Sequence, residues 1–146
     1  MIPMRTALAM GLILALAAAA GAETSVGQES IGATPSVQPV SWDGWLAAKA
    51  NAEKRDAEGD LVGALQYYLE YVRQAEGLNS PARVAWGKNN AAYMIIKMHR
   101  QDPTVDLGPA KKMLEEGLAV PGATEDCRKT MTMNLEHVKA TLGTER

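Results

Sequence analysis

The sequence predicts an all-α domain of about five antiparallel helices. Several segments repeat apolar residues at the 3.6-residue period of an amphipathic helix. Helix-capping residues precede these segments, and glycine or proline follows them. No segment shows the two-residue alternation of a half-buried strand. These three observations favour helices packed against helices over a fold that contains a sheet.

The first two predicted helices are separated by the turn Gly59-Asp60. The first helix is expected to begin near Ser41 or Asp43 and to end at about Glu58. Its helical spacing is visible in Trp45, Ala48, Ala52 and Arg55. Asp60 is the expected N-cap of the second helix, because its carboxylate can accept N–H groups of the first turn. The apolar stripe of the second helix consists of Leu61, Ala64, Leu65, Tyr68 and Val72.

The second helix is predicted to end in a left-handed C-cap at Gly77, followed by a hydrophobic contact from Leu78. Ser80 can then cap a third helix, and Pro81 suits its first position, where a missing N–H costs nothing. This helix is expected to run to about residue 100, because the following Asp-Pro pair breaks it.

Two further helices complete the prediction. The fourth is expected from about Leu107 to Ala119, where a Pro-Gly pair ends it, and Thr124 caps a fifth that Gly143 closes. The stripe of the fourth helix consists of Leu107, Ala110, Met113, Leu114 and Leu118. The stripe of the fifth consists of Cys127, Met131, Leu135, Val138 and Leu142.

Small residues recur where paired helices would cross. Ala52 and Ala64 lie twelve residues apart, on either side of the predicted turn, and small side chains let two helix backbones approach closely. Ala92 and Ala110 form a second pair, with a spacing of 18, and the six extra residues are expected to lengthen the turn or the helix before it. The complete set of candidate repeat positions is Ala52, Gly59, Asp60, Ala64, Leu65, Tyr68, Ala92 and Ala110.

This pattern resembles the tetratricopeptide repeat, in which a small residue, a glycine-acid turn and an Ala-Leu-x-x-Tyr run follow one another. The resemblance covers about residues 42–142, with Asn134-Leu135 in a lone C-terminal capping helix. It implies a stack of helical hairpins that binds a protein segment in a groove. About three repeats are usually needed for a stable stack, so self-association or a bound partner is expected to complete the core.

The N-terminus has the layout of a secretory signal peptide. Arg5 is followed by an apolar run from Ala7 to Ala22, and cleavage is expected before Glu23. The run has 16 residues, whereas about 20 are needed to span a bilayer as a helix. An uncleaved N-terminal anchor is the alternative, and it is the only membrane attachment we expect. The protein is therefore expected to be exported to a periplasm or secreted.

The predicted chain thus has four parts. Residues 1–22 form the signal peptide, residues 23–41 a flexible linker, residues 42–143 the helical domain and residues 144–146 a tail. The linker is rich in Ser, Thr, Gly, Gln and Pro without a helical or strand period. A role for it as a docking tail is an alternative to that of a spacer.

Composition limits the function classes. The chain has 47% hydrophobic residues and a formal net charge of −2, so it lacks the basic excess typical of nucleic-acid binding. His99, Cys127 and His137 are the only soft metal ligands, and no metal-binding spacing joins them. Cys127 is expected to be buried, with an exposed thiol able to form an intermolecular disulfide as the alternative. We expect no cofactor, no metal and no catalytic residues.

A peptide-reading stripe is predicted on the third helix. Trp86, Asn90, Tyr93 and Lys97 lie at offsets 0, 4, 7 and 11, and Lys49 lies on the matching side of the first helix. Two aromatics, an amide and cations suit apolar side chains, a peptide backbone and carboxylates. Two alternatives stay open: Trp86 and Tyr93 could simply pack against the first helix, and Lys49, Glu53 and Asp56 could form a solvated face.

The sequence therefore predicts an exported interaction module that binds a partner protein segment. One alternative is a structural subunit whose apolar surface assembles a homo- or hetero-oligomer. An enzyme or small-ligand protein using His99 or His137 is a third hypothesis.

Overall fold

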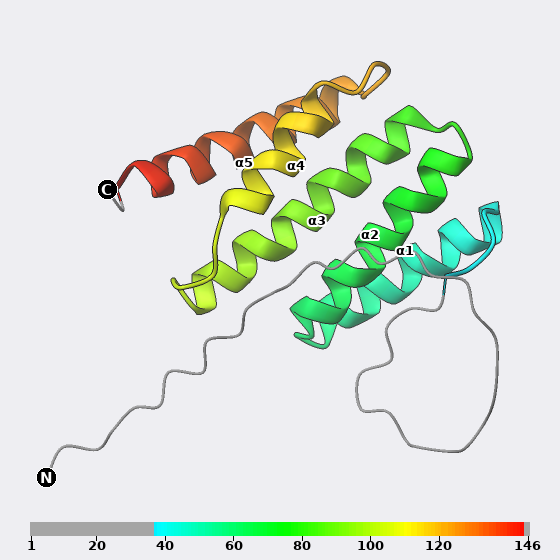
Figure 1. The fold of residues 1–146 in the computed structure, drawn as a ribbon, viewed down its shortest axis with the longest axis horizontal. Coiled ribbons are helices and arrows are strands. Elements are labelled where there is room, and N and C mark those ends of the chain that lie inside the picture. Colours follow the sequence, from blue (N-terminus) through cyan, green and yellow to red (C-terminus); the bar gives the residue numbers. More distant parts are fainter. Residues whose placement is uncertain (1–36, 145–146) are drawn as a thin grey trace, which may run out of the picture. The chain divides into compact units, whose positions relative to one another are not determined.

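The structure, a computed structural model, describes residues 37–144 and contains five α-helices and no strand in that range (Figure 1). The helices are α1 (Trp42–Ala57), α2 (Leu61–Gly77), α3 (Pro81–Gln101), α4 (Gly108–Leu118) and α5 (Glu125–Thr144). The all-α prediction is confirmed. The predicted signal peptide and residues 23–36 of the predicted linker lie outside the described residues, as do residues 145–146.

Consecutive helices lie side by side and run antiparallel, in chain order, from α1 to α5 (Figure 1). Helices α1 and α3 both pack against α2 and run in the same direction, and α5 contacts α3 as well as α4. The main core draws residues from all five helices, and a smaller cluster joins the first three helices around Ala48, Tyr71 and Val84.

The first hairpin has the predicted register. Ala52 and Ala64 are 0% exposed and belong to the main core. Gly59 has a φ of 79°, a left-handed conformation that glycine adopts without strain. Asp60 is the N-cap of α2, and its carboxylate accepts a hydrogen bond of 2.9 Å from the N–H of Gly63.

In the second hairpin, α3 and α4, the small residues are farther apart in sequence than in the first. Both a longer helix and a longer turn contribute to this spacing. Ala92 and Ala110 are fully buried, as predicted for a pair of crossing positions. The extra residues between them lie partly in α3, which reaches Gln101, and partly in the connection 102–107. Hydrogen bonds from Thr104 to the carboxylate of Asp102 close the first turn of that connection.

The predicted C-cap at Gly77 is wrong in its geometry. The left-handed residue after α2 is Asn79, with a φ of 51°, whereas Gly77 is the last helical residue. A Cβ at position 77 would lie 2.7 Å from a methyl group of Val40. A larger side chain at position 77 would therefore have to displace Val40.

Two other helix ends refine the predictions. Ser80 stands at the N-cap of α3, but its hydroxyl accepts a hydrogen bond from Arg83 instead of one from the helix backbone. Thr124 caps α5 as predicted, since its hydroxyl accepts from the N–H of Cys127 at 3.3 Å. Gly143 does not close α5, which continues through Thr144.

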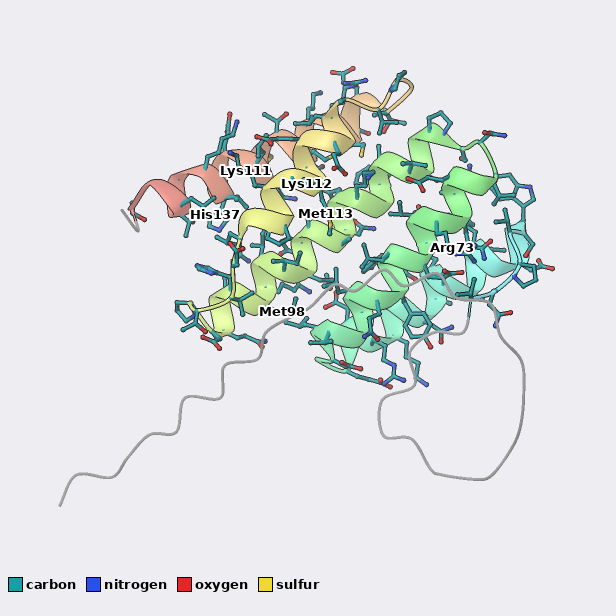
Figure 2. The ribbon with its side chains drawn as sticks, viewed as in Figure 1. Arg73, Met98, Lys111, Lys112, Met113 and His137 are labelled. Atoms are coloured by element: carbon teal, nitrogen blue, oxygen red, sulfur yellow. The ribbon has the colours of Figure 1, made fainter. Side chains whose placement is uncertain are left out.

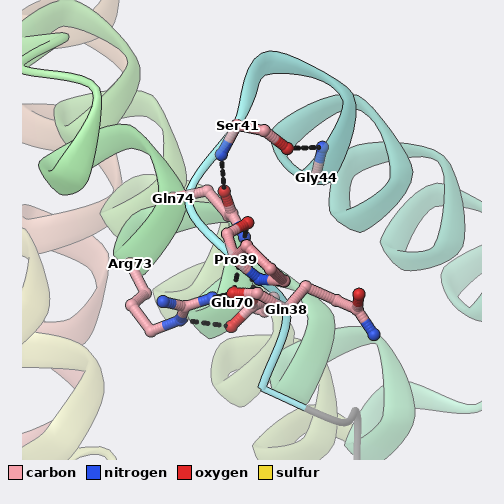
Figure 3. A network of polar contacts seen from close by, with 7 residues as sticks. All are labelled: Gln38, Pro39, Ser41, Gly44, Glu70, Arg73 and Gln74. Atoms are coloured by element: carbon pink, nitrogen blue, oxygen red, sulfur yellow. Dashed lines mark hydrogen bonds and ion pairs between the residues drawn. The ribbon is translucent and has the colours of Figure 1, made fainter.

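The segment before α1 is fixed against α2, although it was assigned to the linker (Figure 3). The side chain of Gln74 is 0% exposed. Its oxygen accepts from the N–H of Ser41 at 2.8 Å, and its nitrogen donates to the carbonyl of Pro39 at 3.0 Å. Glu70 accepts from Gln74 at 3.0 Å. The fixed part of the chain therefore begins before Ser41, because Gln74 replaces the water that would solvate this backbone.

Arg73 extends this network. Its guanidinium binds both carboxylate oxygens of Glu70, at 2.6 and 2.7 Å, and also the carbonyl of Gln38 (Figure 3). Burial alone would raise the pKa of Glu70, but the hydrogen bonds from Arg73 and Gln74 outweigh it and lower the pKa. Glu70 thus stays ionised and orients both donors toward the segment 38–41.

Substituting Ala64→Asp tests the register of the first hairpin. The new carboxylate would be buried without a partner, and it would separate helices that need a small side chain there. An uncompensated buried charge costs about 3–5 kcal/mol, a large share of the roughly 5–15 kcal/mol that stabilises a typical domain. We expect a strongly lowered melting temperature by circular dichroism.

The matched control is Ala50→Asp, at an exposed position of α1. Its free energy of unfolding is expected to stay within about 0.5 kcal/mol of the wild type. A near-wild-type melting temperature for Ala64→Asp would contradict the register.

Substituting Gln74→Leu tests the anchoring of residues 38–41. Leucine keeps most of the volume but leaves the Ser41 N–H and the Pro39 carbonyl without their partner. We expect a loss of about 1–3 kcal/mol, the cost of polar groups left unsatisfied, together with faster hydrogen exchange at the Ser41 amide. Gln66→Leu, at an exposed position of the same helix, is the control. Unchanged protection of the Ser41 amide in Gln74→Leu would rule out this anchor.

Candidate recognition face on helices α1 and α3

Side chains from α1 and α3 form one continuous partly exposed surface, which we call the α1/α3 face. Its members recur every three or four residues along each helix, and each retains contact with solvent. From α1 they are Trp42, Trp45, Lys49, Glu53 and Asp56. From α3 they are Arg83, Trp86, Asn90, Tyr93, Lys97 and Arg100.

Contacts near each end join the two helices across this face. Near the ends of α1 and α3, the ammonium group of Lys97 lies 2.7 and 2.9 Å from the two carboxylate oxygens of Asp56. Near their beginnings, the guanidinium carbon of Arg83 lies 4.9 Å from the ring centroid of Trp42 and 4.8 Å from that of Trp45. These distances are within the range of cation–π attraction. Along α3, the predicted stripe residues Trp86, Asn90 and Tyr93 lie between the residues that make these two contacts.

Aromatic rings from α1 and α2 pack together at the Arg83 end. The rings of Trp42 and Trp45 stand edge to face, with centroids 6.2 Å apart, and Trp45 lies 5.2 Å from Tyr71. Trp42 is 49% exposed. The buried indole N–H of Trp45 makes no hydrogen bond of good geometry to another described residue. This end of the face therefore combines exposed aromatic surface with a fixed cation.

The pKa values of two buried tyrosines of α2, Tyr68 and Tyr71, are raised. Burial raises the pKa of Tyr68, and the carboxylates of Glu53 and Asp56 raise it further. Burial also raises the pKa of Tyr71. Both phenols therefore remain protonated at neutral pH.

The structure brings the five predicted residues onto one surface but gives several of them partners. Trp86 and Tyr93 are partly exposed, with their remaining surface packed against the main core. Lys49 lies 2.6 Å from Glu53, and Lys97 is paired with Asp56, so both lysines have carboxylate partners. The side-chain oxygen of Asn90 accepts from Asn89 at 3.3 Å.

Tyr93 also lies close to two cations. The ammonium group of Lys97 is 5.3 Å from its ring centroid, and the guanidinium carbon of Arg100 is 5.8 Å away. A solvated face of α1 was one alternative for Asp56; in the structure it binds Lys97 across the helices, with 24% of its side chain exposed.

Sequence reasoning missed Trp42, Arg83 and Arg100. The helical period could have placed both arginines on the predicted stripe, since Arg83 precedes Trp86 by three residues and Arg100 follows Lys97 by three. The contact of Trp42 with Arg83 could not be found this way, because it joins residues 41 positions apart.

Two hollows lie elsewhere on the described part of the chain. One, of about 200 Å³, is lined by α1 and α2 residues including Ala47, Asn51 and Tyr67. The other, of about 310 Å³, is lined by Pro81, Val84 and Val120 among others. Neither is lined by any of the five predicted residues, a histidine or the cysteine.

The potential metal ligands are dispersed. Cys127 is 0% exposed, which confirms the expected buried thiol, and burial raises its pKa. His99 lies 2.8 Å from the carbonyl of Val105, in the connection after α3. His137 is an exposed residue of α5 (Figure 2). Within residues 37–144, no group of three or more His, Cys, Asp or Glu side chains is placed to hold a metal ion.

Comparisons of the chain with protein-family models, with curated proteins and with solved structures find no match. In the part of the chain that the structure describes, no helix is both long enough and apolar enough to cross a membrane.

Proposed function

We propose that the protein is an interaction module that binds an extended segment of a partner protein along the α1/α3 face. The observation that carries this proposal is the open row of partly exposed tryptophan, tyrosine, amide and cationic side chains that two helices present together. Aromatic residues and arginine supply most of the binding energy at protein interfaces. Amide and cationic side chains add polar contacts that fix the orientation of a bound chain.

The dimensions of the face suit a short peptide. Arg83 and Lys97 are fourteen residues apart on α3, which corresponds to about 21 Å along a helix at 1.5 Å per residue. An extended chain of about six residues covers that length at roughly 3.3 Å per residue. A small molecule would be expected to favour an enclosed pocket, and neither of the two hollows described above is lined by any of the five predicted residues.

The resemblance to tetratricopeptide repeats supports the same proposal. The candidate repeat positions Ala52, Ala64, Ala92 and Ala110 are all fully buried, and α1 and α3 are equivalent helices of successive hairpins. In such a stack these equivalent helices line the binding groove. The module we propose is tetratricopeptide-like, with α5 as its capping helix.

A second candidate function is assembly into an oligomer. Leu46 is 52% exposed, Val62 53% and Met133 70%, and none of them belongs to the α1/α3 face. Such side chains could bury apolar surface between copies of the chain. A mass that rises with concentration in analytical ultracentrifugation would favour this function, and a constant monomer mass would exclude it.

We further propose that the protein is exported after signal-peptide cleavage. The charged start, apolar run and small residues before Glu23 support this proposal. Mass spectrometry of the protein recovered from a periplasmic or secreted fraction is expected to give a chain that begins at Glu23. A chain that keeps residues 1–22 and stays with the membrane would support an uncleaved anchor instead.

The recognition face is tested by a capture experiment from envelope extract. The wild-type protein is compared with the double variant Trp86→Ala/Tyr93→Ala, after circular dichroism has shown that both are folded. We expect a partner that the wild type retains and the double variant loses, because the variant removes two central aromatic contacts. Val62→Ala/Met133→Ala is the matched control, since it removes exposed apolar side chains of α2 and α5, and it is expected to retain the partner.

A partner that both the wild type and the Trp86/Tyr93 variant retain would place recognition outside this face. Loss of the partner only in the Val62/Met133 variant would move the interface to the exposed apolar side chains of α2 or α5. The absence of a captured partner, together with a concentration-dependent mass, would favour the oligomeric function.

A further inference from the structure

We infer that Arg83 is the receptor for a side-chain carboxylate of the partner, so that the bound segment is acidic. This inference rests on the proposed function, because it places the carboxylate on a segment bound along the α1/α3 face. It goes beyond that function by stating the chemistry of the partner and by naming the residue that selects it.

Arg83 is held in place by its surroundings. Its guanidinium lies in the corner between two indole rings that stand at 83° to each other, with ring centroids 4.9 and 4.8 Å away. It also donates a hydrogen bond of 3.1 Å to the hydroxyl of Ser80. An arginine positioned in this way loses little conformational entropy when it binds an anion.

Arg83 nevertheless keeps most of its hydrogen-bonding capacity. A guanidinium carries five N–H donors in a planar fork, and the bond to Ser80 uses one nitrogen. Among the described residues, no carboxylate forms an ion pair with Arg83. The remaining donors match the two oxygens of a carboxylate, which arginine binds in a bidentate manner.

The charge of the face agrees with an acidic partner. Its anions are Glu53 and Asp56, and each is paired with a lysine, Lys49 and Lys97 respectively. Among the described residues, neither Arg83 nor Arg100 has such a pair. The face therefore has a surplus of positive charge, although the whole chain has a net charge of −2. Complementary charge favours a negatively charged segment and disfavours a basic one.

Arg83 is a better receptor than Arg100. Arg100 lies 5.8 Å from a single ring and is exposed near the end of α3, whereas Arg83 is half-buried against two rings. A carboxylate bound at Arg83 would also place the neighbouring partner residues beside Trp42, which is half-exposed, and one helical turn from Trp86.

The test uses two synthetic octapeptides, one that alternates Glu with Ala and one that alternates Gln with Ala. They have the same length and nearly the same shape but differ in charge. Binding to the full chain is followed by tryptophan fluorescence, because all three tryptophans, Trp42, Trp45 and Trp86, lie on the α1/α3 face. We expect the Glu peptide to bind at least about tenfold more tightly than the Gln peptide, as is typical for a hydrogen bond to a charged group.

The variant Arg83→Gln removes the positive charge and the forked N–H donors of the guanidinium. It is expected to bind both peptides with similar affinity, after circular dichroism has shown that it is folded. The control Arg55→Gln removes an arginine of α1 that is paired with Asp60 and lies outside the face, and it is expected to keep the preference for Glu. In the wild type, the Nε–H resonance of Arg83 is expected to shift on addition of the Glu peptide alone.

Equal binding of both peptides by the wild type, including no binding of either, would overturn the inference. So would a preference for Glu that persists in folded Arg83→Gln, or an Arg83 resonance that the Glu peptide leaves unchanged. The capture experiment with the Trp86/Tyr93 variant judges the recognition face separately, so the face can stand even where an acidic partner is excluded.

Discussion

Ala52 and Ala64 set the separation of α1 and α2, because their small side chains are fully buried between helices that must approach closely. Helix α3 packs against the same α2, so α2 determines where α1 and α3 lie relative to each other. The two helices run in the same direction and present their partly exposed stripes together. The α1/α3 face therefore exists because α1 and α3 both pack closely against α2.

The contacts across the face contribute less to stability than this packing. The ion pair of Lys97 with Asp56 keeps 30% and 24% of the two side chains exposed, and pairs of this kind are worth up to about 1 kcal/mol. A cation–π contact at an exposed site contributes a similar amount, about 0.5–1 kcal/mol. Burial of one large apolar side chain contributes about 1.5–3 kcal/mol. The core thus maintains the fold, and the contacts across the face position the side chains of that face.

Caps, turns and periodic stripes, which depend on neighbouring residues, made most of the fold predictable. The features that the sequence analysis missed depend on contacts between residues far apart in the chain. The Asp60 cap, the Gly59 turn and the periodic stripes each depend on residues within one or two helical turns. The close approach of Val40 to Gly77 and the hydrogen bond of Gln74 to Ser41, 33 residues earlier in the chain, both depend on the segment before α1. The predicted stripe on α3 had the right period, but the pairing of Lys97 with Asp56 needs the packing of three helices and has no sequence signature.

That pairing changes how the face would be used. A partner carboxylate at Lys97 would have to displace Asp56, which already binds the lysine with two oxygens at 2.7 and 2.9 Å. Displacement would leave the carboxylate of Asp56 without its partner, and the exchange of one ion pair for another brings little net gain. At Arg83 no described carboxylate would have to be displaced. In the binding mode we propose, a partner carboxylate should therefore bind at Arg83 in preference to Lys97.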